Sequence, residues 1–343
     1  MNKNKKSDIP MSLLEVKNLV VEFPSRRGTL RALDDISFSI APGEILGVVG
    51  ESGAGKSLTG AAIIGLLEPP GRIASGQILL EGQRIDNLSN DEMRHIRGRR
   101  IGAIFQDPLT SLNPLYTVGR QLTETVLAHL PVTPAEARQR AIQLLKDTGI
   151  PAAEERIDHY PHQFSGGMRQ RVVIALALAA EPKLIVADEP TTALDVSIQA
   201  QIITLLKNIC KSRGAAVMLI THDMGVIAET CDRVAVLYAG RVAEIGPVHD
   251  VINKPSHPYT AGLMASIPDM TMDRERLNQI DGAMPSLNAI PTGCAYNPRC
   301  PHAFDRCMTE RPDLLPAGST RAACWLHADT NAAAATPNAE VTA

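Results

Sequence analysis

A complete phosphate-binding loop lies near the start of the chain and matches the pattern G-x-x-x-x-G-K-[ST]. Its residues are Gly50-Glu51-Ser52-Gly53-Ala54-Gly55-Lys56-Ser57, followed by Leu58. In such a loop successive backbone N–H groups point at phosphate oxygens, and the N-terminus of the next helix adds positive potential. We expect Lys56 to contact the β- and γ-phosphates of a nucleotide, and the Ser57 hydroxyl to ligate Mg²⁺.

The residues on either side of the loop support this interpretation. The sequence predicts a short buried strand at 44–49 and an Ala-rich apolar helix at 58–67. Strand, loop and helix in this order are the context that the motif requires. A Gly-rich turn that matches the motif by accident is therefore a weak alternative.

Two carboxylates follow a second apolar run. Asp188 and Glu189 come directly after Leu-Ile-Val-Ala at 184–187. A buried parallel strand that ends in Asp delivers the carboxylate to the sheet edge where nucleotides bind. We expect Asp188 to hold Mg²⁺ through a water, and Glu189 to activate an attacking water. Taken alone, the pattern also fits a strand that runs into a polar loop; the phosphate-binding loop favours the functional interpretation.

A second anion-binding feature precedes a long apolar helix. It is Ser165-Gly166-Gly167-Met168-Arg169-Gln170, in which Ser-Gly-Gly at a helix N-terminus forms a nest of N–H groups. One ordinary nucleotide site does not need two such nests, so a second nucleotide contact is expected.

The order of these motifs resembles that of the ATP-binding-cassette ATPases over residues 12–250. Gln106 occupies the Q-loop position, Ser165 begins the signature, Asp188 and Glu189 end the Walker B strand, Ala193-Leu194-Asp195 form the D-loop and His222 is the switch histidine. The resemblance implies that two cassettes face each other head to tail. Each ATP then lies between one subunit's phosphate-binding loop and the other's signature.

The resemblance also implies a role for each position. Glu189 would be the general base, and His222 would contact the γ-phosphate and the attacking water. Gln106 would sense the nucleotide and its Mg²⁺, and Phe23 matches the aromatic position that stacks on adenine, where Tyr is commoner.

A finer resemblance is to the ATPase subunits of dipeptide and oligopeptide importers, more to the dipeptide type. It is carried by residues 105–114, residues 188–196 and His257-Pro258-Tyr259-Thr260. It implies two membrane-spanning permease subunits, a second ATPase subunit that is a copy or a paralogue, and an extracytoplasmic peptide-binding protein. Nickel, metal-peptide and glutathione importers share these motifs and stay open as alternatives.

Bulk properties limit the other classes. The 343-residue chain carries a formal charge of −3, whereas proteins that coat nucleic acid are clearly basic. A soluble cassette ATPase of DNA repair or translation is disfavoured, because only one cassette is found. No apolar run approaches a membrane span, and no apolar segment follows the basic residues 1–6 as in a signal peptide. We expect a peripheral protein on the cytoplasmic face of the membrane.

The remaining elements predict an α/β fold with a mainly parallel sheet, antiparallel N-terminal strands and a helical insertion. Strands are expected at 16–23, 36–40, 77–81, 101–105, 183–187 and 217–221, and a hairpin at 234–245. Helices are expected after Ser89, at 118–130, at 134–146, after the signature and at 197–211. Residues 1–11 and 328–343 are predicted to be disordered, 12–250 to be the nucleotide-binding domain with its helical part at about 107–175, and 251–327 to be a separate Cys-rich appendage.

Four of the six cysteines, Cys294, Cys300, Cys307 and Cys324, lie within 31 residues of this appendage. In a reducing compartment such crowding suggests metal before disulfide. Four thiolates suit Zn²⁺ or an iron–sulfur cluster, and their spacing decides for neither; unligated thiols stay possible. The resemblance favours [4Fe–4S], because some dipeptide-importer ATPases hold one here. Since no motif of the ATP site lies beyond His222, we expect this region to affect ATP chemistry little.

Overall fold

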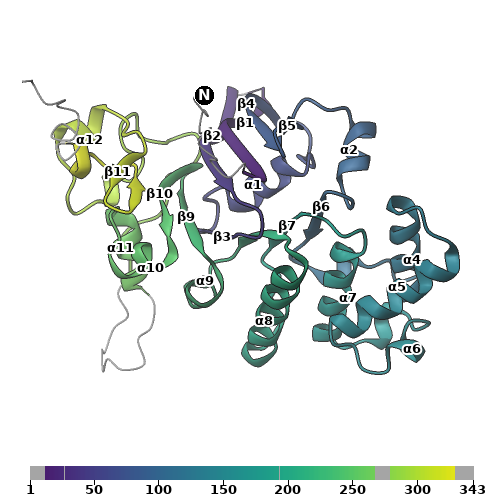
Figure 1. Cartoon of the computed structure of the whole chain (residues 1–343). Coiled ribbons are helices and arrows are strands. Elements are labelled where there is room, and N and C mark those ends of the chain that lie inside the picture. The colour runs from purple at the N-terminus through teal and green to yellow at the C-terminus, as the bar shows by residue number, and fades with distance from the viewer. Residues whose placement is uncertain (1–11, 27, 193, 267–278, 329–343) are drawn as a thin grey trace, which may run out of the picture.

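The computed structural model describes residues 12–26, 28–192, 194–266 and 279–328 (Figure 1). The predicted disordered tails, 1–11 and 328–343, lie outside the described residues except for Ala328, as does Ala193 of the predicted D-loop. Within the described part, no helix combines the length and apolarity that crossing a bilayer would require.

The larger sheet is parallel over five neighbouring strands, as the sequence predicts. Its strand order is β11-β12-β10-β9-β3-β8-β7-β6. The parallel strands are β3 (Ile45–Val49), β6 (Ile101–Ile104), β7 (Leu184–Asp188), β8 (Ala216–Ile220) and β9 (Arg233–Tyr238). The predicted hairpin is confirmed, because β10 (Arg241–Pro247) runs antiparallel to β9.

A second, antiparallel sheet is formed by the N-terminal strands, in the order β2-β1-β4-β5. Its strands are β1 (Leu14–Ser25), β2 (Gly28–Ile40), β4 (Arg72–Leu80) and β5 (Gln83–Arg84). β1 and β2 include the predicted strands 16–23 and 36–40 and begin earlier, β4 begins five residues before the predicted 77–81 and ends one residue short of it, and β5 was not predicted. Two residues without apolar alternation leave no pattern to recognise.

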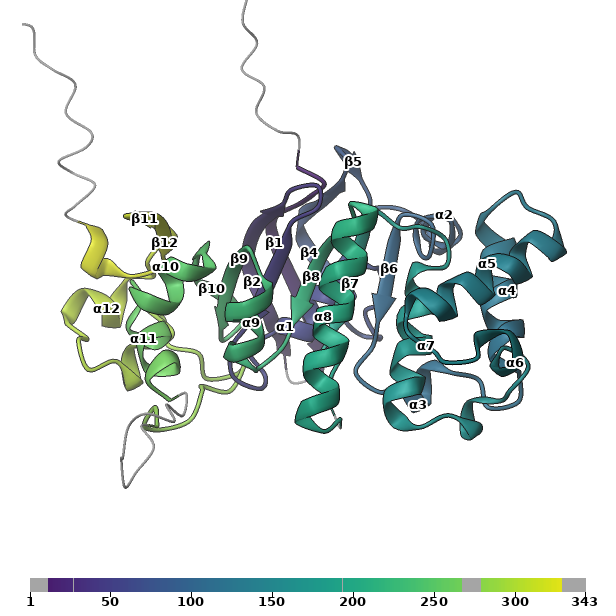
Figure 2. The same cartoon turned by 60° about the horizontal axis from the view of Figure 1, so that its bottom comes forward.

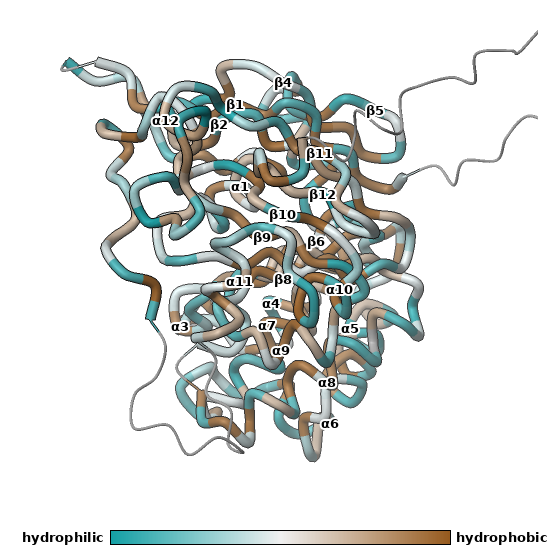
Figure 3. The backbone as a smooth tube through the Cα atoms, turned by 90° about the vertical axis from the view of Figure 1, so that its left-hand side faces the viewer, coloured by the Kyte–Doolittle hydropathy of each residue, from teal (hydrophilic) through white to brown (hydrophobic). Residues whose placement is uncertain are grey.

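The core follows the two-residue period of the central strands. Ile45 and Val49 face one apolar cluster, whereas Leu46 and Val48 face the other. One cluster packs under three helices, α7 (Gly166–Leu178), α8 (Val196–Arg213) and α9 (Met224–Thr230). The other packs under α1 (Lys56–Ile63) and the N-terminal sheet. In the hydropathy view of Figure 3 the tube is brown around β8, in the middle of the molecule. Burial on both faces explains why the central strands are almost continuously apolar.

Local residues determine one end of each of the helices α1 and α2. α1 (Lys56–Ile63) stops four residues short of the predicted Leu67, because Gly65 takes a positive φ of 66° just beyond the C-cap. α2 (Asn90–Ile96) has the predicted capping box of Ser89 and Glu92.

The predicted helical insertion lies between β6 and β7, where the fully described residues contain no strand. It consists of α3 (Pro108–Ser111), α4 (Val118–His129), α5 (Pro134–Asp147), α6 (Ala153–Arg156), η1 (Pro161–Gln163) and α7 (Gly166–Leu178). The capping box of Thr133 and Glu136 is present at α5. In both Figure 1 and Figure 2 these helices sit at the opposite end of the molecule from the C-terminal residues. α8 (Val196–Arg213) confirms the amphipathic helix, and α9 (Met224–Thr230) was not predicted.

The C-terminal part is not the separate appendage that the sequence suggests. It contains α10 (Val248–Asn253), α11 (Pro258–Ala265), η2 (Asn297–Arg299), α12 (Asp305–Thr309), β11 (Leu315–Ala317), β12 (Thr320–Ala322) and η3 (Trp325–His327). β12 pairs with β10 and so extends the main sheet. Tyr259 on α11 is fully buried in the same apolar cluster as β3 and β7.

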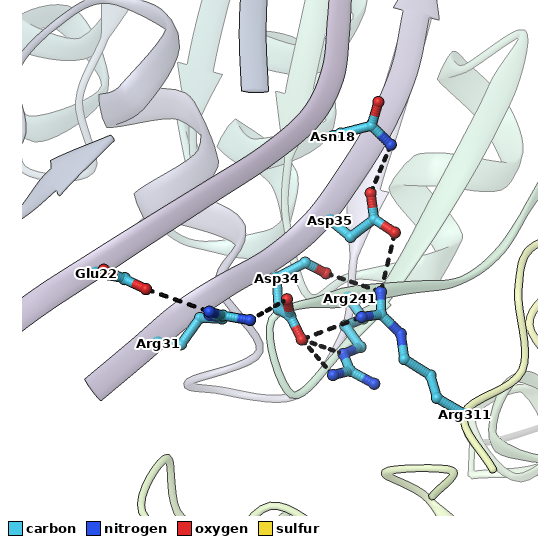
Figure 4. Close-up of polar contacts among 7 residues, drawn as sticks. All are labelled: Asn18, Glu22, Arg31, Asp34, Asp35, Arg241 and Arg311. Atoms are coloured by element: carbon cyan, nitrogen blue, oxygen red, sulfur yellow. Dashed lines mark hydrogen bonds and ion pairs between the residues drawn. The ribbon is translucent and has the colours of Figure 1, made fainter. Parts of the chain in front are cut away.

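Arginines tie this C-terminal part to the N-terminal sheet (Figure 4). Arg311 donates to the Asp34 carboxylate at 3.3 Å and to Asp35 at 3.1 Å, and Arg241 of β10 also binds Asp34. Burial alone would raise the pKa of Asp34, but the hydrogen bond and charge of Arg241, followed by the charges of Arg311 and Arg31, hold it below its usual value. The prediction of an appendage was wrong because these contacts join residues far apart in the sequence.

Candidate functional site

The phosphate-binding loop connects β3 to α1 as predicted. Gly50 has a φ of 148°, and a Cβ there would lie 2.2 Å from the Leu237 carbonyl oxygen, so only glycine fits. Gly55 is the N-cap of α1 with a φ of 101°, and no side chain caps the helix. The first N–H groups of α1 are therefore available to an anion.

Lys56 lies inside this loop and is only 6% exposed. Its Nζ donates to the carbonyl oxygens of Gly50 at 2.9 Å and Glu51 at 3.0 Å. An ammonium group has three donors, so one remains for a phosphate. Burial lowers the pKa of Lys56, an effect that the carboxylates of Glu189 and Asp188 oppose.

The two predicted carboxylates lie beside the loop at the end of β7. Ser57 Oγ donates to Asp188 Oδ1 at 3.0 Å. Burial raises the pKa of Asp188, the neighbouring Glu189 adds to the rise, and the Ser57 hydrogen bond opposes it. Mg²⁺ takes oxygen ligands and is commonly held by one or two protein groups together with substrate phosphates. The pair of Ser57 and Asp188 fits that requirement.

Glu189 occupies a strained backbone position, with a φ of 45°. Positive φ at a residue other than glycine costs on the order of 1–3 kcal/mol and is concentrated at functional sites. Gln106 Nε2 lies 3.1 Å from Glu189 Oε2, and His222 Nδ1 lies 3.3 Å from Glu189 Oε1. The structure thus brings together three residues that are far apart in the sequence.

Thr192 is a further contact of Glu189 that the sequence interpretation missed, with its hydroxyl donating at 2.8 Å. A hydroxyl three residues after the carboxylate was the available signal. Burial would raise the pKa of Glu189, but the hydrogen bonds with Thr192 and His222, and then the charges of His222 and Lys56, keep it below its usual value. Glu189 is therefore an ionised proton acceptor at neutral pH.

A cavity of about 620 Å³ collects most of the predicted nucleotide residues. The predicted residues that line it are Phe23, Ser52, Gly53, Gly55, Lys56, Ser57, Leu58, Gln106, Glu189 and His222. Ala32 and Leu287 line it as well and were not predicted. Phe23 is therefore placed where it could meet a base, and its stacking on adenine stays a prediction.

The signature residues do not line this cavity. Ser165 is the N-cap of α7, and its hydroxyl accepts the Met168 N–H. A Cβ on Gly167 would lie 2.9 Å from Ile198 Cγ2, so the signature packs closely on α8. Asp195 also lies outside the cavity, where it caps α8 by accepting the Ile198 N–H at 2.9 Å.

Two residues far along the chain contact the loop and were not predicted. Tyr259 Oη accepts the Glu51 N–H at 2.9 Å, and Arg299 Nη1 lies 3.1 and 3.0 Å from the two Glu51 carboxylate oxygens. Tyr259 belongs to the His-Pro-Tyr-Thr motif, in which His257 caps α11 and Pro258 is its first residue. That motif was the only signal in the sequence.

The four clustered cysteines are all free thiols. Among the described residues, no group of three or more His, Cys, Asp or Glu side chains is arranged to hold a metal ion. Burial raises the pKa of Cys324 to about 11, and Cys294, Cys300 and Cys307 contribute to that rise, so the thiols are near neighbours. The predicted [4Fe–4S] or Zn²⁺ site is thus not supported by this arrangement.

Comparison with protein families gives two matches. Residues 33–192 match the family described as "ABC transporter", and residues 243–307 match "Oligopeptide/dipeptide transporter, C-terminal region". The second match covers α11 and η2, which carry Tyr259 and Arg299, the two residues that contact Glu51 of the loop.

Among characterised relatives, the dipeptide transport ATP-binding protein DppD of Escherichia coli (strain K12) is 48% identical over 304 residues. The match covers 89% of this chain and 93% of that protein. The oligopeptide transport ATP-binding protein AppD of Bacillus subtilis (strain 168) is 46% identical, over 94% of this chain and 98% of its own length. A dimeric ATP-binding cassette in a post-hydrolysis state with ADP and phosphate has a TM-score of 0.62 at 31% identity, over 68% of this chain and 98% of its own.

Proposed function

Because this chain belongs to the ABC transporter family, as an ATP-binding protein with the oligopeptide/dipeptide transporter C-terminal region, we propose that it powers the import of dipeptides or oligopeptides by hydrolysing ATP. The observation that carries the proposal is the convergence of Lys56, Glu189 and His222 on one cavity. The C-terminal family match favours peptides over nickel, metal-peptide or glutathione substrates.

In this proposal the loop binds the phosphates and Glu189 takes the proton. Backbone N–H groups at the start of α1 and the free donor of Lys56 hold the β- and γ-phosphates. Mg²⁺, held by Ser57 and Asp188 with Gln106 beside them, would neutralise phosphate charge. Glu189 accepts a proton from the attacking water, and His222, 3.3 Å from its carboxylate, orients that water and the γ-phosphate.

The remaining site residues act in the partner's nucleotide site. Ser165, Gly166 and Gly167 lie outside this chain's cavity, which supports a contact with ATP held by a second ATPase subunit. We place that subunit, a copy or a paralogue, and two permease subunits on the cytoplasmic face of a membrane. An extracytoplasmic peptide-binding protein would deliver the substrate.

The substitution Glu189→Gln tests the catalytic part. It keeps the shape and the neighbouring Mg²⁺ ligands but removes the proton acceptor, so ATP hydrolysis by the assembled transporter should fall by about 100- to 10,000-fold. Binding of AMP-PNP with Mg²⁺ should persist. Turnover within a few fold of wild type would show that Glu189 is not the base.

Transport itself needs a second measurement. Proteoliposomes that contain the whole complex and its binding protein should accumulate labelled dipeptide when ATP is supplied on the ATPase side. Accumulation of nickel or glutathione in place of dipeptide would transfer the assignment to those importers.

A separate proposal concerns the C-terminal cysteines. We propose that a metal group, [4Fe–4S] in preference to Zn²⁺, binds to Cys294, Cys300, Cys307 and Cys324. This proposal rests on the sequence alone, in which four cysteines lie within 31 residues, because among the described residues no group of three or more His, Cys, Asp or Glu is arranged to hold a metal. Protein purified without oxygen should contain about four iron and four sulfide per chain. Stoichiometric zinc without iron would replace the cluster by a zinc site, and neither metal would leave four thiols.

A further inference from the structure

The second residue of the phosphate-binding loop, Glu51, holds an unexpected position. The motif G-x-x-x-x-G-K-[ST] leaves this residue free, so phosphate chemistry does not require a carboxylate there. Glu51 nevertheless makes two contacts with residues more than 200 positions later in the chain. Its negative charge also stands in the loop that must receive a triphosphate.

Arg299 neutralises that charge from a buried position. Its side chain is 6% exposed, and its guanidinium contacts both Glu51 carboxylate oxygens. Nε of Arg299 also donates to the Asp281 carbonyl at 2.9 Å, and Nη1 lies 3.3 Å from Tyr238 Oη. The arginine is therefore fixed by the C-terminal segment and by β9 before it meets the loop.

Tyr259 holds the backbone of the same residue. Its hydroxyl accepts the Glu51 N–H, and its ring packs against Tyr238 and Tyr296 with centroids 4.6 and 5.4 Å away. Arg299 lies about 6 Å above the Tyr238 and Tyr296 rings. Three tyrosines and one arginine thus pack together as one cluster against Glu51 of the loop.

The C-terminal segment contacts the loop and cavity at two further places. Met284 Cε lies 3.2 Å from where a Cβ on Gly53 would be, and Leu287 lines the nucleotide cavity. A second anchor is the pairing of Arg311 with Asp34 and Asp35 (Figure 4). Asp34 follows Leu33, whose side chain packs against Gly55 of the loop.

We propose that Arg299 and Tyr259 are positioning residues for the nucleotide: they hold Glu51, fix the shape of the phosphate-binding loop and so set its affinity for ATP. This proposal departs from the expectation, based on the sequence, that the region beyond His222 affects ATP chemistry little. Cys300 follows Arg299 in the chain. Unfolding of the segment that contains the four cysteines would therefore displace Arg299 and weaken ATP binding. The inference rests on ATP binding at the loop and is independent of the transported substrate.

The test measures AMP-PNP binding with Mg²⁺ by calorimetry on the purified full-length chain. Arg299→Met leaves an unpaired carboxylate beside the phosphates and a loosened loop, so the dissociation constant should rise by about tenfold, the effect of losing a hydrogen bond to a charged group. In the assembled transporter KM for ATP should rise in parallel while kcat changes little. Glu51→Gln added to Arg299→Met removes the unpaired charge and should recover most of the lost affinity.

The control is Arg306→Met in the same segment. Arg306 pairs with Glu310 and stacks on Trp325 but touches no loop residue, so AMP-PNP binding should stay within twofold of wild type. If Arg299→Met folds poorly, Tyr259→Phe removes only the oxygen that accepts the Glu51 N–H and should still weaken binding about threefold or more.

Three outcomes would overturn the proposal. They are unchanged binding in both Arg299→Met and Tyr259→Phe, equal loss in Arg306→Met, or no recovery on adding Glu51→Gln. Lys56→Ala separates this failure from a failure of the site itself. If Lys56→Ala binds AMP-PNP as well as wild type does, the loop is not the nucleotide site. If Lys56→Ala loses binding while Arg299→Met and Tyr259→Phe bind normally, the loop is the site and only the role proposed for Arg299 and Tyr259 is wrong.

Discussion

His257 offers a quantitative test of how tightly the C-terminal part is built into the fold. Its side chain is 3% exposed, and its Nδ1 accepts the Tyr259 N–H at 3.0 Å at the start of α11. Burial lowers the pKa of His257 to about 4; a hydrogen bond with the Ala323 backbone opposes this shift, and His327 adds to it. A neutral ring is thus required by the native packing.

The size and sign of the effect follow from linkage. In the unfolded chain the ring titrates at its ordinary pKa of 6.5, so between pH 6.5 and 4 the unfolded state binds more protons than the folded state. Stability must then rise with pH across this window. The contribution is complete above pH 6.5 and is lost as pH falls to 4. The difference between these two pKa values corresponds to about 3 kcal/mol, of which about 2 kcal/mol is lost by pH 5.

The assay is urea unfolding between pH 5 and 8 for wild type and His257→Asn, whose side-chain oxygen can still accept the Tyr259 N–H. The wild-type free energy of unfolding should fall by about 2 kcal/mol more than that of the variant between pH 8 and 5. Other groups near His257, such as Glu244 and His327, are present in both proteins, so their contributions to the pH dependence of stability cancel when the two proteins are compared. His249→Gln, which removes an exposed ring, should keep the wild-type slope. Parallel pH profiles for wild type and His257→Asn would refute the argument.

Three more results are expected. Phe23→Ala should weaken AMP-PNP binding on the order of tenfold while Phe23→Tyr retains it, because an adenine would lose its stacking surface; equal affinity in Phe23→Ala would remove this residue from the site. Thr133→Ala should lower the free energy of unfolding by about 1 kcal/mol, since α5 loses its N-cap, whereas a loss below 0.3 kcal/mol in urea titrations would contradict the cap. The isolated chain should hydrolyse ATP slowly and a two-cassette complex faster per subunit; full activity in a sample shown to be monomeric by light scattering would exclude a shared site.

Much of the site could be predicted because its chemistry is local in the sequence. A phosphate-binding loop needs glycines where Gly50 and Gly55 have positive φ, and it needs a strand before and a helix after. Those requirements act over about twenty residues, so they leave a pattern. The same holds for the capping box of Thr133 and Glu136, because a hydroxyl and a carboxylate three residues apart satisfy each other's N–H groups.

The contacts of the C-terminal part could not be predicted, because they depend on tertiary packing. Arg299 and Glu51 are 248 residues apart, and nothing near either residue specifies the other. Neighbouring segments lack a helical or strand period, so β12 was not expected to extend the main sheet through its two paired residues. The four cysteines led to the prediction of a metal site, which the structure does not support. The contact that the structure does show in this segment is made by Arg299, next to Cys300, with Glu51.

The N-termini of α1 and α7 differ in whether they face the nucleotide cavity of this chain. α1 begins beside the cavity with an open N-terminus, whereas α7 begins outside it. At α7, Ser165 satisfies the N–H groups of Met168 and Arg169, which leaves those of Gly166 and Gly167 available to an acceptor from elsewhere. Under the proposed function, this acceptor is a phosphate of the ATP that a second subunit holds. Since Arg299 and Tyr259 contact the loop and not α7, their loss should weaken ATP binding without altering the surface on which a second subunit docks.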